Sequence, residues 1–217
     1  MLSVAVLASG RGTNLQALLE AEREDRLGPS SIDVVVSDNG DARALERAES
    51  LDVEAVVADP EGKDRESYDA ELVDLLEARG VDLVVLAGFM RVLSSTFISA
   101  FPRRIINIHP ALLPAFRGLD AQRQALDAGV RVAGATTHFV TEEVDAGPII
   151  LQSAVPVLAD DDEEALSRRI LETEHEILPA SVRLYAEGRL SVEEGQVQVK
   201  GSYEAPGRIV PEVVNDG

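Results

Sequence analysis

Short apolar runs alternate with amphipathic stretches along the first half of the chain. The apolar runs predict strands, at residues 2–7, 32–36, 54–58 and 83–87. The stretches between them space their apolar residues as helices do, and they predict helices at residues 15–26, 42–51 and 65–79. The predicted strands carry few polar positions, as strands buried on both faces do. The pattern therefore predicts a doubly wound α/β fold with a mostly parallel sheet and right-handed crossovers.

After a fifth apolar run at residues 105–108, the pattern changes. Two β-rich segments, 134–140 and 149–157, are joined by a short link and predict an antiparallel pair that closes the sheet. A long helix is expected over residues 162–187, with a disturbance at Pro179. It begins with acidic residues, which the helix dipole favours at that end. The second half therefore adds antiparallel strands and a long C-terminal helix to the parallel sheet.

Length and composition favour one domain. With 217 residues and 45% hydrophobic content the chain can bury one core, and no repeat or long linker divides it. We expect one catalytic domain over residues 1–190, then a hairpin and a loosely ordered tail over residues 191–217. The absence of cysteine excludes disulfides, thiolate catalysis and cysteine-ligated zinc. Without a membrane-length apolar run or a leader-like start, the protein is expected to be soluble and cytoplasmic.

The charge balance is strongly acidic. The chain has 20 Lys and Arg residues against 39 Asp and Glu residues, a formal net charge of -19 and a pI near 4.4. A negative field of this size repels nucleic acids and anionic membranes, so neither is expected as a partner. Acidic runs such as residues 160–164 predict a salt-adapted surface, because salt screens self-repulsion. An ordinary acidic cytosolic protein is the alternative.

Polar residues stand at the end of the fifth predicted strand. The apolar run there ends in Asn107 and His109 and is stopped by Pro110. Residues two apart in a strand share a face, so Asn107 and His109 can point at the same ligand. An amide donor, an imidazole that can be charged, and a carboxylate such as the downstream Asp145 can stabilise an oxyanion and move protons.

A glycine-rich loop, residues 9–14, joins the first predicted strand to the first helix. Glycines let backbone N–H groups approach an anion, and the helix N-terminus adds its dipole and its unsatisfied donors. The spacing matches neither the P-loop nor the full dinucleotide fingerprint, so a monophosphate is the better ligand. A tight turn that binds nothing is the alternative.

Four motifs together resemble the phosphoribosylglycinamide formyltransferase family. They are residues 9–16 (SGRGTNLQ), 85–93 (VLAGFMRVL), 107–114 (NIHPALLP) and 145–150 (DAGPII). The resemblance covers roughly residues 1–190. It implies a Rossmann-like formyltransferase fold, and the transfer of a formyl group from 10-formyltetrahydrofolate to the amine of glycinamide ribonucleotide in purine synthesis. These two small molecules are the implied partners, and no metal is required.

The resemblance implies which residues bind the nucleotide, namely Gly12, Thr13, Asn14, Gly88, Pro110 and Glu174. The first three would hold the 5′-phosphate, and Glu174 would bind the ribose hydroxyls. The other two would make backbone contacts. A solvated helix carboxylate is the alternative interpretation of Glu174.

For the folate, the resemblance implies an apolar slot at the end of a strand, whose backbone groups read the edge of the heterocycle. The implied residues are Arg65, Met90, Arg91, Val92, Leu93, Asn107, Val140 and Thr141, with Ile98, Ile105 and residues 140–145 as further walls. Arg65 and Arg91 could meet the carboxylates of the glutamate tail, because a guanidinium matches a carboxylate in a two-point contact. Core packing is the alternative for Ile98 and Ile105.

The implied catalytic residues are Asn107, His109 and Asp145. As the amine attacks the formyl carbon, the developing oxyanion would accept hydrogen bonds from the Asn107 amide and from His109 as an imidazolium. Asp145, if close to His109, would favour the charged imidazole and help to relay the proton from the amine to the folate nitrogen. His138 is expected to be a core or supporting residue, and His175 to lie on a helix surface.

Two other functions stay open. Formyltetrahydrofolate deformylase uses the same three residue types with water as acceptor, although it usually carries a regulatory domain ahead of the catalytic one. A phosphate-binding module without catalysis would need only the first loop, and would leave Asn107, His109 and Asp145 without a role. The protein is expected to be a monomer or a homodimer.

Overall fold

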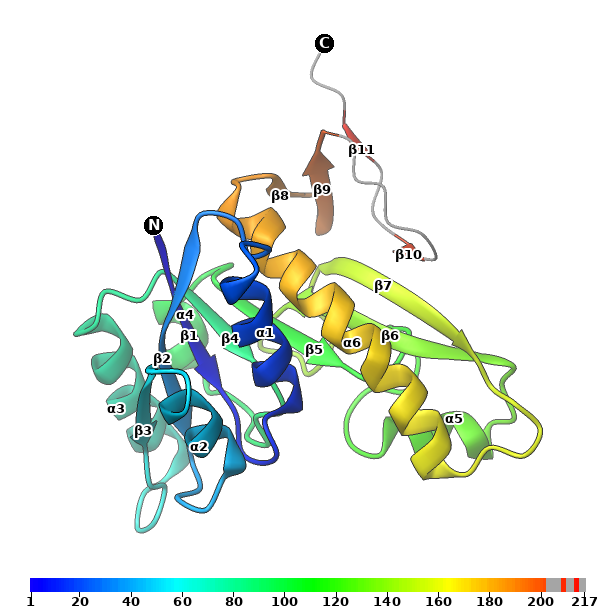
Figure 1. Cartoon of the computed structure of the whole chain (residues 1–217), viewed down its shortest axis with the longest axis horizontal. Helices are drawn as coiled ribbons and strands as arrows, with labels where there is room; N and C mark the ends of the chain where they lie inside the picture. Colours follow the sequence, from blue (N-terminus) through cyan, green and yellow to red (C-terminus); the bar gives the residue numbers. More distant parts are fainter. Residues whose placement is uncertain (202–207, 210–212, 215–217) are drawn as a thin grey trace. The chain divides into compact units, whose positions relative to one another are not determined.

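The computed structural model describes residues 1–201, 208–209 and 213–214, and the chain divides into two compact units (Figure 1). The first unit comprises Met1–Asn107 and the second Ile108–Gly217. Each unit buries its own apolar side chains, such as Val6 and Leu18 in the first and Leu151 and Ile177 in the second. A single catalytic domain over residues 1–190 stays a prediction.

The first unit is built on a parallel sheet. Its strands are β1 (Leu2–Leu7), β2 (Ser30–Ser37), β3 (Glu54–Val57), β4 (Leu83–Leu86) and the start of β5 (Ile105–His109), in the order β5-β4-β1-β2-β3. All neighbours are parallel, and Val6 of β1 lies in register with Val35 of β2 and Val85 of β4. β4 is buried along its whole length and β1 from Val4 onward, as their unbroken apolar runs predict.

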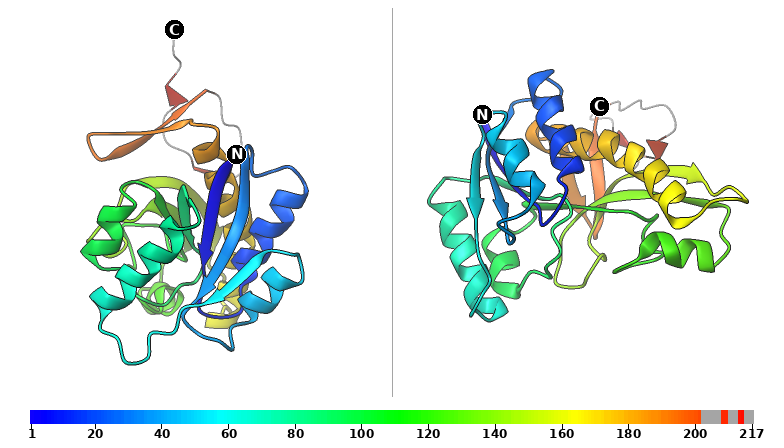
Figure 2. Two further views of the ribbon diagram at one scale, coloured as in Figure 1. Left: turned by 90° about the vertical axis from the view of Figure 1, so that its left-hand side faces the viewer. Right: turned by 60° about the horizontal axis from the view of Figure 1, so that its bottom comes forward.

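The helices of the first unit cover both faces of its sheet. They are α1 (Thr13–Arg23), α2 (Arg43–Glu49), α3 (Arg65–Glu77) and α4 (Ser95–Ala100). α1 and α2 lie on one face, and α3 and α4 lie on the other (Figure 2). α1 begins two residues earlier than the apolar spacing predicts. α4 is not predicted by that spacing, because one cap and one buried side chain fix it: the Ser94 hydroxyl accepts from the N–H of Phe97, and the Phe97 ring is fully buried.

The second unit contains the antiparallel pair and the long helix. β6 (Val132–Phe139) and β7 (Ile149–Pro156) pair in antiparallel register, with Ala135 opposite Ser153. The strand order is β5-β6-β7-β10, where β10 (Arg208–Ile209) pairs antiparallel with β7. α6 (Glu163–Ala186) packs on β6 and β7, while α5 (Ala121–Asp127) is a short helix that the sequence pattern does not predict. The predicted fold class is confirmed: a mostly parallel sheet, antiparallel strands near the C-terminal part, and a long C-terminal helix.

α6 begins as the sequence predicts but is not broken where a disturbance is expected. The side chain of Asp162 caps it by accepting from the N–H of Ala165 at 2.8 Å, and Glu163 and Glu164 occupy its first turn. It continues as one helix through Pro179, which is buried. Packing of its apolar face outweighs the one N–H that proline removes.

The predicted hairpin is formed by β8 (Leu190–Glu193) and β9 (Gln196–Lys200). Glu194 and Gly195 make its two-residue turn with φ values of 49° and 81°, the twist that tight hairpins favour. β11 (Val213–Val214) pairs with β9 in parallel. The predicted loosely ordered tail falls mainly on residues 202–207, 210–212 and 215–217, which lie outside the described residues.

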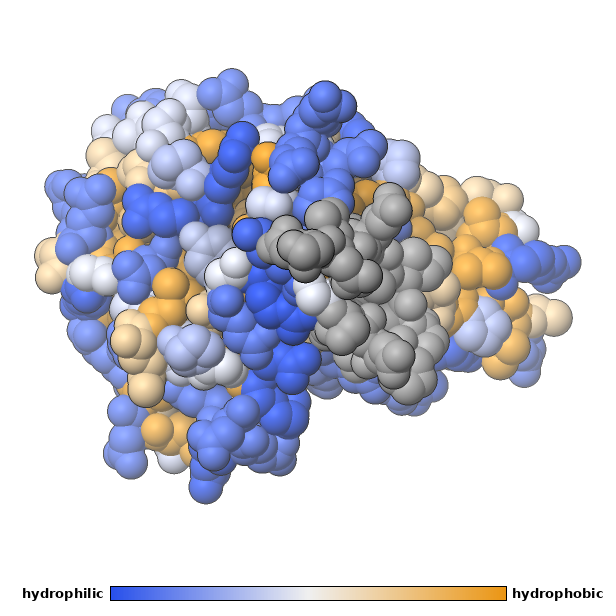
Figure 3. All heavy atoms as spheres, turned by 90° about the horizontal axis from the view of Figure 1, so that it is seen from above, coloured by the Kyte–Doolittle hydropathy of each residue, from blue (hydrophilic) through white to orange (hydrophobic). Residues whose placement is uncertain are grey.

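The lengths of the helices and the polar character of the surface relate to the predicted cytoplasmic location. Among the described residues, no helix combines the length and the apolar character needed to cross a lipid bilayer. The face drawn in Figure 3 mixes hydrophilic and hydrophobic residues, with hydrophobic residues gathered at its right-hand end. The salt-adapted surface and the cytoplasmic location stay predictions from composition.

Candidate active site

The loop between β1 and α1 depends on one glycine. Gly12 adopts a left-handed conformation with φ 68° and stands at the N-cap of α1. A Cβ atom on Gly12 would lie 2.8 Å from the Cα and 2.9 Å from the Cβ of Ala44 in α2. Both the dihedral angle and the close approach of α2 therefore require glycine here.

The N-terminus of α1 is suited to an anion. In the described part of the chain no side chain caps its first turn, and that turn holds no acidic residue. The first N–H groups of any helix lack intrahelical acceptors and carry partial positive charge. Thr13 and Asn14 are the first two residues of α1, and Asn14 is buried. The predicted phosphate-binding residues thus meet at one helix N-terminus, an arrangement that binds phosphate groups elsewhere.

A second loop, residues 87–94, follows β4 and is tied to the first. The N–H of Ser9 donates to the carbonyl oxygen of Gly88 at 3.1 Å, and the Ser9 hydroxyl accepts from the N–H of Met90 at 2.9 Å. Met90 and Val92 are 69% and 52% exposed, whereas Leu93 is buried. Exposed apolar side chains close together in the sequence can form the wall of an apolar ligand site.

Arg91 turns inward in this loop. Its guanidinium stacks over the ring of Tyr68 in α3, 4.5 Å from the ring centroid. Tyr68 is fully buried, and this burial, followed by the charge of Asp38, raises the pKa of its hydroxyl above the ordinary value. The next residue of α3, Asp69, accepts from the N–H of Ser94 at 2.5 Å. α3 therefore anchors the loop on both sides of Val92, and the Arg91 side chain takes part in that anchor.

Arg65 differs from Arg91 in its surroundings. It is exposed and stands directly after Asp64, which caps α3 by accepting from the N–H of Ser67 at 2.8 Å. An exposed guanidinium can meet an incoming carboxylate without first breaking an internal contact. Of the two arginines expected to bind a glutamate tail, only Arg65 presents its side chain to solvent in this way.

The strand β5 carries two of the predicted catalytic residues. Asn107 and His109 are alternate residues of β5, so both side chains lie on the same face of the strand. Asn107 stands in register with Leu86 of β4. His109 ends the strand and is 5% exposed, and Pro110 follows it, as the sequence predicts.

His109 has hydrogen-bond acceptors at both ring nitrogens. Its Nε2 lies 2.8 Å from the carbonyl oxygen of Phe116, and its Nδ1 lies 3.4 Å from Oδ2 of Asp145. Neither a carbonyl nor an ionised carboxylate can donate, so each nitrogen is best satisfied when it carries a proton. His109 therefore lies between two acceptors that fix the orientation of its ring, and its role as a charged donor stays a prediction.

Asp145 is held as a carboxylate by several donors. Its Oδ2 accepts from the N–H of Gly118 at 2.9 Å, and its Oδ1 lies 3.6 Å from Nε2 of the buried His138. Burial alone would raise the pKa of Asp145. The contact with His138, the Gly118 N–H and the charges of His109 and His138 outweigh it and hold the pKa below its ordinary 3.8. Asp145 is therefore ionised at neutral pH and able to fix a positive imidazole.

The loop that carries Asp145 is closely packed. A Cβ atom on Gly147 would lie 1.8 Å from the carbonyl oxygen of Phe139, at the end of β6. The N–H of Phe139 donates to the carbonyl oxygen of Pro148 at 2.9 Å. The turn read from the sequence thus has a physical reason: glycine lets the loop lie directly on β6, which fixes the position of Asp145.

The other predicted residues fall into two groups. Glu174 is 7% exposed on α6, so it is not the solvated carboxylate considered as its alternative. Ile105 lies in the core, whereas Thr141 is exposed and Val140 half-buried on the loop after β6. His175 is half-buried on α6. The described residues include no cluster of His, Asp or Glu side chains able to hold a metal ion.

Sequence reasoning missed two kinds of contact at these loops. His138 is a buried supporting residue, as predicted, but its contact with Asp145, near the end of β6, was not foreseen. Sequence reasoning also missed Arg47 of α2, whose guanidinium donates to the carbonyl oxygen of Arg11 in the first loop at 2.9 Å. Position near a strand end is a usable signal for His138, whereas the sequence holds none for Arg47.

Comparisons with known proteins identify the family to which the chain is similar. A family model described as formyl transferase matches residues 2–182. Phosphoribosylglycinamide formyltransferase of Escherichia coli (strain K12) is 40% identical over 206 residues, which make up 94% of this chain and 97% of that protein. The crystal structure of glycinamide ribonucleotide transformylase 1 from Symbiobacterium toebii has a TM-score of 0.90 and 56% sequence identity, and the match covers 92% of this chain and 94% of that one.

Two further relatives are similar over only part of their length. Trifunctional purine biosynthetic protein adenosine-3 of Drosophila melanogaster is 46% identical over 187 residues, and the chain spans 14% of its length. A formyltetrahydrofolate deformylase from Pseudomonas syringae pv. tomato has a TM-score of 0.83 at 32% identity, and the match covers 65% of it. Identity and coverage are both lower for the deformylase than for the Symbiobacterium protein.

Proposed function

The chain belongs to the formyl transferase family, and we propose that it transfers the formyl group of 10-formyltetrahydrofolate to the amine of glycinamide ribonucleotide in purine biosynthesis. The similarity to the Escherichia coli phosphoribosylglycinamide formyltransferase, over nearly the full length of both proteins, carries this proposal. The contact between His109 and Asp145 supports it, because it joins the acid and the carboxylate that formyl transfer requires.

The proposed chemistry centres on β5. When the amine nitrogen attacks the formyl carbon, a C–N bond forms and the carbonyl oxygen gains negative charge. In the proposed step, the Asn107 amide and Nε2 of the protonated His109 both donate to that oxygen. In this structure the same Nε2 lies 2.8 Å from the carbonyl oxygen of Phe116. The proton lost by the amine passes to the folate nitrogen as its bond to the formyl carbon breaks. Asp145 keeps His109 charged and oriented throughout.

We assign the nucleotide to the first loop and the residues implied with it. Gly12, Thr13 and Asn14 at the start of α1 bind the phosphate through N–H donors and the helix dipole. Glu174 binds the ribose hydroxyls, and Gly88 and Pro110 contact the nucleotide through their backbone. The burial of Glu174 favours a specific role over that of a solvated helix carboxylate.

We assign the folate to the loop after β4 and to the residues after β6. The exposed side chains of Met90 and Val92 form apolar walls, while backbone groups of the segment Met90–Leu93 read the edge of the heterocycle. Val140, Thr141 and Asn107 complete the proposed set. Arg65 takes the glutamate carboxylate, because its guanidinium is exposed and that of Arg91 is stacked on Tyr68.

A transfer assay tests the function. Purified protein in molar salt should convert 10-formyltetrahydrofolate to tetrahydrofolate only when glycinamide ribonucleotide is present. Folate turnover at the same rate without the amine would instead identify a deformylase. His109→Ala should lower turnover by about 10²- to 10³-fold while folate still binds. Unchanged turnover in that variant would remove His109 from the mechanism.

We further propose a cytoplasmic protein that requires no metal ion and has no nucleic-acid or membrane partner. A monomer or a homodimer is the proposed assembly, which sedimentation in the assay buffer measures directly. Activity that rises with salt would support the salt-adapted surface, because ions screen repulsion among the 39 acidic residues.

A further inference from the structure

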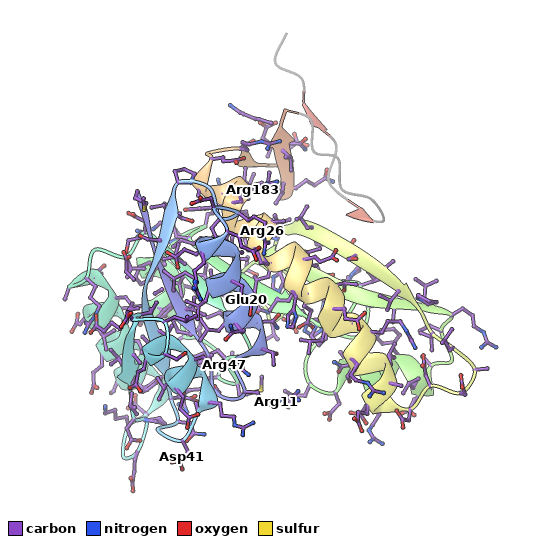
Figure 4. All side chains as sticks on the ribbon, viewed as in Figure 1. Arg11, Glu20, Arg26, Asp41, Arg47 and Arg183 are labelled. Carbon is purple, nitrogen blue, oxygen red and sulfur yellow. The ribbon has the colours of Figure 1, made fainter. Side chains whose placement is uncertain are left out.

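α2 holds the phosphate loop at successive carbonyl groups. The N–H of Ala44 donates to the carbonyl oxygen of Gly10 at 3.1 Å. The Nε of Arg47, one turn later in α2, donates to the carbonyl oxygen of Arg11 at 2.9 Å. Figure 4 labels Arg47 on α2 and Arg11 on the loop that enters α1. Two neighbouring peptide groups of the loop are thus oriented by one helix.

The contact of Arg47 with the Arg11 carbonyl also sets the direction of the next backbone N–H group. The carbonyl of residue 11 and the N–H of residue 12 belong to one planar trans peptide and point in opposite directions. When Arg47 draws the Arg11 carbonyl toward α2, the Gly12 N–H must point away from α2. The Ala44 contact does the same for the Arg11 N–H. Consecutive N–H groups held in this way form a concave site for an anion.

Arg47 contacts the loop and α1 at the same time. Its Nη1 donates to Oε1 of Gln16 in the first turns of α1 at 3.0 Å, while its Nε holds the Arg11 carbonyl. A guanidinium presents several donors in a fixed plane, so it can join two acceptors rigidly. A lysine ammonium carries the same charge but has no such plane. The geometry, beyond the charge, therefore needs arginine.

We propose that Arg47 is a positioning residue for the nucleotide substrate: it fixes the Arg11–Gly12 peptide so that the Gly12 N–H faces the phosphate. The proposal rests on the assignment of the phosphate to this loop. Arg47 touches neither reacting group, so it affects nucleotide binding and leaves the chemical step unchanged.

Three variants separate geometry from charge. Arg47→Gln removes both the planar guanidinium and its charge, whereas Arg47→Lys removes the planar guanidinium and keeps the charge. Arg43→Gln is the matched control, because Arg43 is exposed on the same helix and the change in net charge equals that of Arg47→Gln. Melting temperatures of all three confirm that the fold is kept.

Steady-state kinetics gives the first readout. Both Arg47 variants should raise KM for glycinamide ribonucleotide by about 10-fold, the equivalent of about 1.4 kcal/mol. Their kcat and their KM for the folate should stay within about two-fold of the wild type, as should every constant of Arg43→Gln. A wild-type KM in Arg47→Lys, or an equal rise in Arg43→Gln, would overturn the proposal, since charge alone would then explain the effect.

Calorimetric titration with ribose 5-phosphate at fixed ionic strength gives a readout that needs no turnover. Weaker binding to both Arg47 variants, with unchanged binding to Arg43→Gln, supports the positioning role even if the wild type fails to transfer formyl groups. Equal affinity of ribose 5-phosphate for the wild type and all three variants would refute the positioning role, even if the wild type transfers formyl groups. Failure of the proposed function and failure of this inference are therefore distinguishable.

Discussion

Replacing Gly12 by alanine tests the structural basis of the phosphate loop most directly. The new Cβ atom would lie 2.8 Å from the Cα of Ala44, and the residue would keep a φ of 68°. The left-handed conformation costs an alanine about 1–2 kcal/mol, and forcing a methyl group into a filled space costs about 1–3 kcal/mol. The free energy of unfolding should therefore fall by about 2–5 kcal/mol.

Two other glycines separate these contributions. Gly62 has a φ of 74° with nothing within 4 Å of its Cβ position, so Gly62→Ala carries only the dihedral penalty. Gly10 also has open space around its Cβ position, and its φ lies outside the left-handed range. Gly10→Ala should change stability by less than about 0.5 kcal/mol.

Urea unfolding of the wild type and the three variants measures the series. Thermal unfolding gives a second readout: at about 2–4 °C per kcal/mol for a chain of this size, the melting temperature should fall by about 4–20 °C in Gly12→Ala and by about 2–8 °C in Gly62→Ala. The phosphate affinity of Gly12→Ala should fall as well, because α1 and α2 must separate to admit the methyl group. If Gly12→Ala is no less stable than Gly62→Ala, the close approach of α2 is not a constraint and the reasoning fails.

Three further predictions concern the second loop and Asp145. The folded-state pKa of Asp145 is held below 3.8, so its stabilising effect is present above that pH and is lost as pH falls through the lower value. The stability difference between wild type and Asp145→Asn, from urea unfolding, should therefore shrink as pH falls below about 4; a difference independent of pH would contradict this. Asp69→Ala leaves the N–H of Ser94 without its acceptor, so KM should rise for the folate but not for the nucleotide; equal changes in both constants would remove the anchoring role. Gly147→Ala must displace the loop of Asp145, because the new Cβ atom would lie 1.8 Å from the carbonyl oxygen of Phe139. Both kcat and the melting temperature should therefore drop, and wild-type turnover would refute the catalytic role of Asp145.

Much of the fold can be predicted because the strands of the parallel sheet are buried on both faces. Their aliphatic runs, such as Leu83–Leu86, give a strong local signal, and the candidate residues follow directly where such runs end. The pair Asn107 and His109 was predicted in this way. The contact between Asp145 and His109 depends on the tertiary structure and could not be read from the sequence. The turn at Gly147, which positions Asp145, could be predicted from the sequence.

The features that could not be predicted depend on contacts between distant residues. α4 is six residues long, and its stability comes from the Ser94 cap and from burial of Phe97 rather than from apolar spacing. α6 continues through Pro179 because its neighbours hold it. The Arg47 contact spans 36 positions along the chain, and no local pattern in α2 distinguishes it from the exposed Arg43.

Ser9 belongs to the loop assigned to the nucleotide, and its N–H donates to the carbonyl oxygen of Gly88, which is assigned to the same ligand. Its hydroxyl accepts from the N–H of Met90, which is assigned to the folate. One residue therefore makes the conformations of two binding loops interdependent. If either ligand orders its loop, the other loop is already partly ordered when the second ligand arrives, and the two affinities become thermodynamically linked. Such linkage is reciprocal, so each substrate must tighten the binding of the other by the same factor, and Ser9→Ala should reduce that factor toward one.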